Sequence, residues 1–447
     1  MACGQTGGVS LPLIPAPARL ELLDGDPYPV PAELTTSTAV ENHEDGGYRL
    51  RVGADTGFAS AAADDRGASA ARSTSVQLVE LTDRSVPALE IEDAPRYPWR
   101  GLMIDVCRHF FGPATLRKVL DLAALYKLNV LHLHLTDDQG WRYEVPNRPE
   151  LIERASTSEV DGGAGGHLSV ADLAELTAYA AERGIMIVGE IDLPGHTAAA
   201  LHAVPALNPG GVAREVYTGT DVGHSTLRLD LPETAAFLED AVGALVEQST
   251  GDFVHVGGDE VRLLSPEEYA AFIQHVEALV LRLGKRPVFW QEAAPALQDA
   301  RSVLQLWDSN ADPAPVVAAA ARGHQVILSP GNRAYLDMKY DAATELGLDW
   351  AGHVDVRDAY DWDPATLVPG LPPEAILGVE AALWTETIRT EDDLFSMLLP
   401  RLPAIAEVAW SVPEVRAWEV FAEDLPAHRA LWDARGLAHA DRPLTGR

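Results

Sequence analysis

Two adjacent acids, Asp259 and Glu260, follow two glycines at the end of the apolar run at 253–256. Hydrolysis of a glycosidic bond commonly uses two carboxyls that face each other, about 5–5.5 Å apart in retaining enzymes and about 6.5–9.5 Å apart in inverting ones. Consecutive residues of an extended chain point to opposite sides, so these neighbours are poorly placed to face each other across a bond. We expect one acid to transfer a proton and the other to hold a nearby group. The competing interpretation is two solvated acids that cap the next helix.

Further polar and aromatic residues stand at the ends of other apolar runs. Trp290, Trp307 and Trp384 each close such a run, and Arg100 precedes the first one. Sugar rings and acyl groups pack on indole faces, so three tryptophans on one rim favour an aromatic pocket over core packing. Beside so many carboxylates, Arg100 is interpreted as a clamp for hydroxyl groups.

These residues must be positioned by a regular alternation of strands and helices that begins near residue 97. The predicted strands are 101–106, 129–135, 185–191, 253–258, 287–291, 303–307, 325–329 and 376–384. Amphipathic helices are predicted between them, for example at 113–128, 169–184, 266–284 and 313–323, several with Pro in the first turn and Gly after the last. Strand–helix alternation implies parallel strands, and eight of them predict a closed (β/α)8 TIM barrel whose chemistry lies at the carboxyl ends of the strands.

The first 96 residues have a different pattern and are predicted to form a small N-terminal α/β domain (1–96) before the barrel catalytic domain (97–447). The Ala-rich run at 59–73 is interpreted as a helix, flanked by β-like runs at 48–52 and 74–81. The segment 92–101 contains two prolines and is interpreted as the linker into the barrel.

The overall composition excludes several classes of function. A formal net charge of −33 leaves no basic excess for nucleic acid or an anionic membrane. Cys3 and Cys107 are the only cysteines, so neither a disulfide framework nor a Cys-based zinc site is expected. Neither a signal peptide nor a transmembrane span is indicated, so we expect a cytoplasmic protein, or a secreted one whose signal peptide is absent from this chain.

Six motifs in this order resemble a known family, the family 20 glycoside hydrolases or β-N-acetylhexosaminidases, and particularly their actinobacterial members. The motifs are RGLMIDVCRHF (100–110), LHLHLTDDQGWR (131–142), EIDLPGH (190–196), HVGGDEV (255–261), AYLDMKY (334–340) and LWTE (383–386). The resemblance covers about 95–440. It implies exo-acting, retaining removal of terminal non-reducing β-GlcNAc or β-GalNAc through an oxazolinium intermediate.

The resemblance also implies roles for individual residues. Glu260 would be the general acid/base, Asp259 would orient and stabilise the 2-acetamido group of the substrate, and Tyr335 would hydrogen-bond its carbonyl oxygen. Asp137 and His196 would form a polar chain to Glu260. The implied substrate contacts are the acetyl-binding Trp290, Trp307 and Trp384, the hydroxyl-binding Arg100, Asp137, Asp337 and Glu386, and Trp350 on the leaving-group side.

Three alternatives stay open at this point. The paired His132 and His134 are reminiscent of metal-dependent amidohydrolase barrels, although we expect structural roles for both and no metal or cofactor. A catalytically inactive glycan-binding barrel would be expected to lose the acid or the acetamido-orienting pair. Within the family, lacto-N-biosidase-type action on a disaccharide is a further alternative. The expected partners are oligosaccharides or glycoconjugates that end in an N-acetylhexosamine, and the oligomeric state is open.

Overall fold

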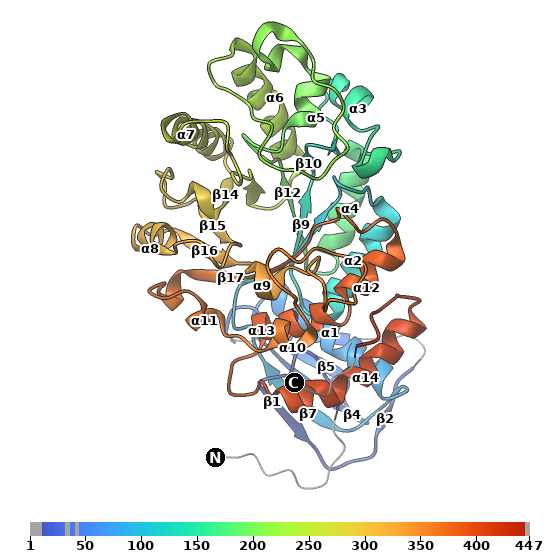
Figure 1. Cartoon of the computed structure of the whole chain (residues 1–447). Helices are drawn as coiled ribbons and strands as arrows, with labels where there is room; N and C mark the ends of the chain where they lie inside the picture. The colour runs from blue at the N-terminus through green and yellow to red at the C-terminus, as the bar shows by residue number, and fades with distance from the viewer. Residues whose placement is uncertain (1–10, 32–35, 41–43, 443–447) are drawn as a thin grey trace.

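A computed structural model of the chain describes residues 11–31, 36–40 and 44–442 and contains a closed barrel of eight parallel strands (Figure 1). In barrel order these are β12 (Met186–Glu190), β13 (Phe253–His255), β14 (Arg286–Trp290), β15 (Val303–Leu306), β16 (Gln325–Leu328), β17 (Ile376–Leu383), β8 (Trp99–Asp105) and β9 (Val130–His134). Each overlaps one of the eight predicted strands, so the TIM-barrel prediction is confirmed.

Helices surround the strands, and several of them begin at a side-chain cap. Ser169 caps α4 (Val170–Ala181) and Ser265 caps α7 (Pro266–Arg282), each in a reciprocal capping box with an acid three residues later. The other helices of the barrel region are α2 (Pro113–Leu125), α3 (Pro149–Ala155), α5 (Ala198–Ala203), α6 (Pro232–Gln248), α8 (Ala314–Ala321), α9 (Gly331–Ala334), α10 (Val356–Tyr360), α11 (Pro364–Leu367), α12 (Glu391–Leu398), α13 (Arg401–Trp410) and α14 (Trp418–Ala434). No helix among the described residues is long and apolar enough to cross a membrane.

The N-terminal part forms a five-stranded sheet that lies beneath the barrel in the view of Figure 1. Its order is β1 (Arg19–Leu22), β7 (Leu89–Asp93), β4 (Tyr48–Gly53), β5 (Gly57–Ala62) and β3 (Thr36–Val40), and a short pair, β2 (Tyr28–Pro29) and β6 (Ser85–Val86), lies beside it. Helix α1 (Asp65–Leu81) contacts the sheet through β4 and β5 and the barrel region through α2 and α14. The helix therefore couples the two parts of the chain.

Two sequence predictions in this part are wrong. Residues 59–62 are not helical but belong to β5, and the helix starts only at Asp65, where Asp64 accepts a hydrogen bond from the Gly67 main chain. The run at 74–81 is not a strand but the second half of α1. Buried Thr74 and Leu78 lie one helical turn apart, and Thr74 Oγ1 contacts the Tyr48 hydroxyl of β4 at 2.7 Å, so packing against the sheet overrides the β preference of the branched side chains.

The barrel interior carries buried charge. On β12, Glu190 is contacted by His134 Nδ1 at 2.5 Å and His255 Nδ1 at 2.8 Å, and it accepts a hydrogen bond from Trp290 Nε1 at 2.9 Å. On β17, Glu380 accepts hydrogen bonds from Trp99 Nε1 and Gln305 Nε2, both at 2.8 Å. His132 lies between the two acids, 2.8 Å from Glu380 and 3.1 Å from Glu190.

Glu380 has room because its neighbour on β8 is a glycine. Gly101 is its register partner, and a Cβ added at Gly101 would lie 2.1 Å from Glu380 Oε2. Part of the barrel interior is therefore occupied by a hydrogen-bonded polar network of carboxylates, imidazoles and indole N–H groups.

Candidate active site

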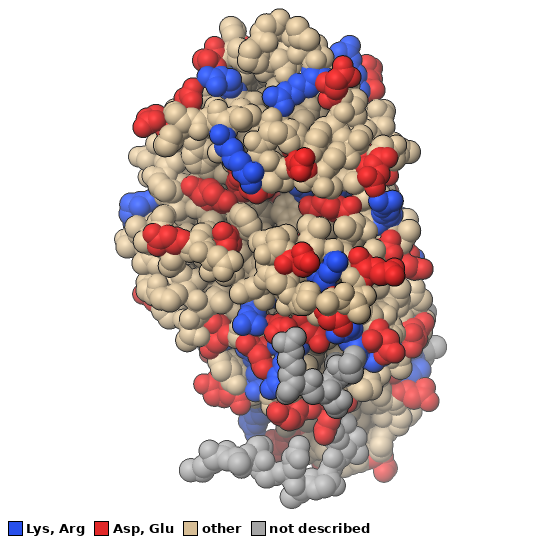
Figure 2. Space-filling view, in the orientation of Figure 1, with Lys and Arg blue, Asp and Glu red and all other residues tan. Residues whose placement is uncertain are grey.

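A pocket of about 370 Å³ opens where the strands end, and nine of the twelve predicted site residues line it. They are His196, Asp259, Glu260, Trp307, Tyr335, Asp337, Trp350, Trp384 and Glu386. Figure 2 shows a hollow in this face of the molecule with acidic side chains on either side of it. The volume is that of a site for one small ligand rather than for an extended chain.

The backbone after β13 turns so that both adjacent acids reach this pocket. Gly257 and Gly258 have φ of 69° and 111°, and a Cβ at Gly257 would lie 1.8 Å from Asp192 Oδ1. Glu260 itself has φ 50°, in the left-handed region that a non-glycine residue seldom adopts. Such strain persists only where the surroundings enforce it, and it commonly marks a functional site. The glycines thus end the extended strand before the acids, which therefore need not point to opposite sides.

His196 lies between the acid pair and a second buried carboxylate. Its Nε2 is 3.6 Å from both Asp259 Oδ2 and Glu260 Oε2, and its Nδ1 is 3.3 Å from Asp137 Oδ1. Although burial disfavours the imidazolium, Asp137, Asp259 and Asp192 raise the pKa of His196 well above its usual value. The arrangement connects Asp137 to Glu260 through one imidazole, a geometry suited to moving or holding a proton.

Several buried polar atoms of the pocket have no hydrogen-bond partner within the described residues. These are Asp259 Oδ1, both carboxylate oxygens of Asp337, and His196 Nε2. An unsatisfied buried polar group costs about 1–3 kcal/mol, so such a cluster indicates where a polar ligand binds. Burial, together with Glu260 and Glu190, raises the pKa of Asp259, and burial and Glu386 raise that of Asp337.

Aromatic rings form the walls of the pocket. Trp307 lies nearly parallel to Tyr335, with 6.4 Å between ring centroids, and Trp350 meets both of these rings edge-on. Trp384 also lies beside Tyr335, with ring centroids 6.3 Å apart and the rings tilted by 52°. Trp350 is 48% exposed and therefore lies at the mouth of the pocket. Aromatic walls combined with several carboxylates are typical of a carbohydrate site.

The family assignment rests on residues 97–413, which match the family described as glycosyl hydrolase family 20, catalytic domain. The chain belongs to glycosyl hydrolase family 20. This confirms the resemblance seen in the sequence motifs, and it makes the chain a glycoside hydrolase of the β-N-acetylhexosaminidase type.

Individual relatives agree with this assignment. The chain is similar to a β-N-acetylhexosaminidase of Cellulomonas fimi, with 53% identity over 79% of this chain and 71% of the relative. The structure is similar to the GH20 β-N-acetylhexosaminidase of Streptomyces coelicolor A3(2), with a TM-score of 0.93, 38% identity and 98% of each chain covered. It is also similar to a mutant Streptomyces plicatus β-hexosaminidase in complex with its product GlcNAc, with a TM-score of 0.92, 37% identity and 97% of each chain covered.

In this family 20 hydrolase, Arg100 is not placed to be the hydroxyl clamp that the sequence predicted. It is the second residue of β8, at the opposite end of the barrel strands, where its guanidinium donates to the main-chain oxygens of Tyr97 and Lys127 and lies over Trp410. The pocket instead contains Arg108, which follows β8 and is 2.9 Å from Asp137 and 3.3 Å from Asp105. The sequence signal for Arg108 is its position two residues after the predicted strand 101–106.

Two other predicted residues lie behind the pocket wall. Trp290 is 1% exposed, donates to Glu190 and has its ring centroid 6.0 Å from that of Trp384, so it supports the wall from within. Asp137 is buried beneath the pocket and contacts His134, His196 and Arg108. Sequence reasoning also missed Thr220 and Val222, which line the pocket from a long loop without any motif to reveal them.

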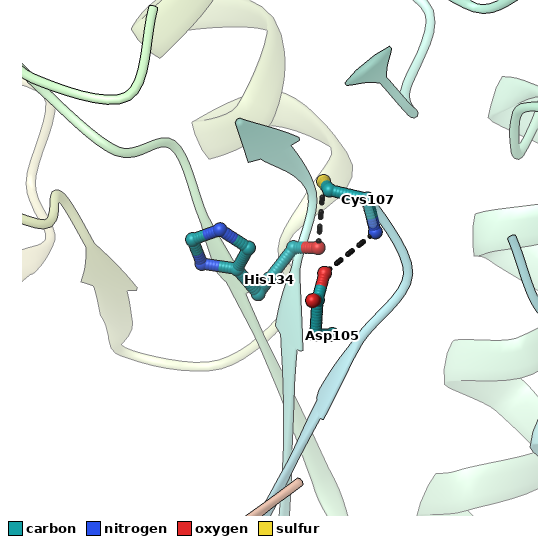
Figure 3. Close-up of side chains that lie close together, drawn as sticks. All are labelled: Asp105, Cys107 and His134. Atoms are coloured by element: carbon teal, nitrogen blue, oxygen red, sulfur yellow. Dashed lines mark hydrogen bonds between the residues drawn. The ribbon is translucent and has the colours of Figure 1, made fainter. Parts of the chain in front are cut away.

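The histidines of the barrel interior are engaged with carboxylates. His134 uses both ring nitrogens, toward Glu190 at 2.5 Å and Asp137 at 2.8 Å. Asp105, Cys107 and His134 lie close enough together to be considered as metal ligands. In Figure 3, however, the imidazole points away from Cys107, whose thiol contacts the main-chain oxygen of His134 at 3.1 Å. A metal ion bound here would have to displace these contacts.

Proposed function

We propose that this glycoside hydrolase removes single terminal β-linked GlcNAc or GalNAc residues, using the acetamido oxygen of the substrate as the nucleophile. The observation that carries the proposal is the position of Asp259 and Glu260. Both carboxylates lie 3.6 Å from the same imidazole nitrogen of His196. Two acids that share one side of the pocket cannot flank a glycosidic bond, so the pair divides the work within one mechanism.

In this mechanism Glu260 protonates the leaving oxygen while the acetamido carbonyl oxygen attacks the anomeric carbon. A bound oxazolinium ion results, and Glu260 then accepts a proton from the water that opens it, so that two inversions give net retention. Asp259 accepts a hydrogen bond from the acetamido N–H and stabilises the developing positive charge. Burial raises the pKa of Tyr335 well above 10, so its hydroxyl stays protonated and donates to the acetamido oxygen.

The remaining groups hold the sugar. Asp337 and Glu386 line the pocket, and both oxygens of Asp337 are buried without a hydrogen-bond partner among the described residues, so they accept hydrogen bonds from sugar hydroxyls. Trp307 and Trp384 enclose the acetyl group, and the half-exposed Trp350 stacks on the leaving-group side. A pocket of about 370 Å³ admits one terminal sugar, which makes the action exo from the non-reducing end. The product complex of the Streptomyces plicatus relative supports GlcNAc-terminated glycans as substrates.

The proposal predicts dependence on the 2-acetamido group. We expect aryl β-GlcNAc and β-GalNAc glycosides to be hydrolysed, and the matching β-glucoside to react at least about 100-fold more slowly, because the hydroxyl cannot replace the internal nucleophile. A thiazoline that mimics the oxazolinium should inhibit far more strongly than GlcNAc, as an intermediate analogue does. Comparable kcat/KM values for the β-glucoside would contradict the proposed function.

The two arginines provide a second prediction. Arg108→Lys should raise KM for an aryl β-GlcNAc about tenfold. The planar guanidinium, which contacts both Asp105 and Asp137, is replaced by a single ammonium group. Arg100 is buried near α1, outside the pocket, so Arg100→Lys should lower the thermal midpoint and leave KM within about twofold. Steady-state kinetics of the two variants, with thermal unfolding of each, tests this assignment. A raised KM in the Arg100 variant alone would restore the role predicted from sequence.

A further inference from the structure

The dipeptide Gln291–Glu292, directly after β14, forms hydrogen bonds with Trp307. Trp307 is a residue of the pocket wall and follows the next strand, β15. Gln291 Oε1 accepts hydrogen bonds from the main-chain nitrogens of Trp307 at 2.8 Å and Asp308 at 3.0 Å. The carboxylate of Glu292 accepts the Trp307 indole Nε1–H, with oxygens at 3.1 and 3.2 Å. One dipeptide therefore fixes both the backbone and the ring of Trp307.

The ring of Trp307 needs such a restraint because its packing is open on one side. The indole is only partly buried, since it faces the pocket, and its aromatic neighbours are the parallel Tyr335 and the edge-on Trp350. The indole also packs against the hydrophobic core, but apolar packing is non-directional and does not by itself select one tilt of the ring. The hydrogen bond from Nε1 to Glu292 is the polar contact that fixes the tilt of the ring.

We propose that Glu292 is a positioning residue that sets the size of the N-acyl pocket by holding Trp307 against Tyr335, and that it thereby selects acetyl over larger N-acyl groups. This inference rests on the proposed function, in which Trp307 encloses the acetyl group. Neither the acid pair nor the hydroxyl-binding carboxylates contact Trp307 Nε1 among the described residues, so the role falls to Glu292.

The charge state of Glu292 is consistent with this role. Burial, reinforced by Asp259 and Glu260, raises the pKa of Glu292 to about 8. Below that pH it is a neutral carboxyl, which still accepts the indole N–H through its carbonyl oxygen and adds no further negative charge beside Asp259. A glutamine therefore reproduces the group that acts near neutral pH, whereas an alanine removes the acceptor.

The experiment compares Glu292→Ala and Glu292→Gln in the full chain. The substrates are 4-nitrophenyl β-glycosides of N-acetyl-, N-propionyl- and N-butyrylglucosamine at about pH 6, and the readout is the acetyl-to-butyryl ratio of kcat/KM. We expect Glu292→Ala to lower this ratio at least about fivefold, mostly through the acetyl substrate. Glu292→Gln should keep the ratio within about twofold of the wild-type value.

The matched control is Glu277→Ala, which removes another buried carboxylate, on α7, that accepts bonds from Ser302 Oγ and the Gln298 main chain outside the pocket. It should lower the thermal midpoint without changing the ratio. An equal change in this control, an unchanged ratio in Glu292→Ala, or a lost preference in Glu292→Gln would overturn the inference. If Glu292→Ala fails to fold, Glu292→Met, which keeps the side-chain volume but removes the acceptor, takes its place with the same expected ratio. A wild-type enzyme that hydrolyses β-glucosides equally well would instead contradict the proposed function itself.

Discussion

Glu260→Gln should lower kcat/KM about 10³-fold on a chitobiose-type substrate, whose sugar leaving group needs protonation. On an aryl glycoside with an acidic phenol as leaving group, the loss should be no more than about tenfold in the first step. General acid catalysis is typically worth about 10²–10⁴-fold, and the amide cannot donate an equivalent proton. The strained backbone at Glu260 and its place beside His196 support the proposed assignment of Glu260 as this acid. Steady-state kinetics on the two substrate types measures the difference.

The control for this variant is Glu268→Gln. Glu268 is an acid in the capping box of α7, and a glutamine preserves the capping geometry. Its rates should stay within about twofold on both substrates. Equal losses in Glu260→Gln on the sugar and the aryl leaving group would assign the proton transfer to another residue.

Asp259→Asn should lower kcat about 10²–10³-fold on both kinds of leaving group, a loss of about 3–4 kcal/mol of transition-state stabilisation. In the proposed mechanism the Asp259 carboxylate stabilises the positive charge that develops on the acetamido group, and the amide removes the negative charge of the side chain while keeping its shape. Independence from the leaving group distinguishes this residue from Glu260. The smaller change Tyr335→Phe removes one hydrogen bond and no charge, and we expect about a tenfold loss.

A trapping experiment tests whether a carboxylate of the protein acts as the nucleophile. A 2-deoxy-2-fluoro glycoside lacks the acetamido nucleophile and should leave the protein unmodified in intact mass spectrometry. A covalent adduct on Asp259 or Glu260 would show a protein nucleophile and overturn the substrate-assisted mechanism. A loss in Asp259→Asn that appears only in KM would instead assign Asp259 to ground-state binding.

The fold could be predicted because strand–helix alternation is a local property of the sequence. Every barrel strand is an apolar run bounded by turn residues, and the rule that parallel strands carry chemistry at their carboxyl ends led directly to Asp259, Glu260 and Trp384. The same rule separates the two arginines, since Arg100 is the second residue of β8 whereas Arg108 follows the strand. Placing Arg100 in the pocket was an error in applying the rule.

Other features depend on contacts between distant strands, which one sequence does not reveal. Whether Trp290 faces the pocket or the barrel interior is set by strand tilt and by its bond to Glu190 on β12. The support of Trp307 by Glu292 requires knowing how the ends of β14 and β15 lie side by side. In the N-terminal part, the helical run at 74–81 was misread because its branched side chains favour strands unless a sheet is there to pack against.

The glutamate–glycine pair of the barrel interior matters for building chimeric enzymes. The Glu380 side chain on β17 occupies the space that a side chain at Gly101 on β8 would need. The two strands are neighbours in the barrel but lie at opposite ends of the barrel sequence. Half-barrel exchange between relatives would take the two residues from different parents. If one parent supplied a residue with a side chain at position 101 and the other supplied Glu380, the two side chains would collide. Crossover points in such recombination libraries should therefore be chosen so that β8 and β17, the first and last strands of the barrel, come from the same parent.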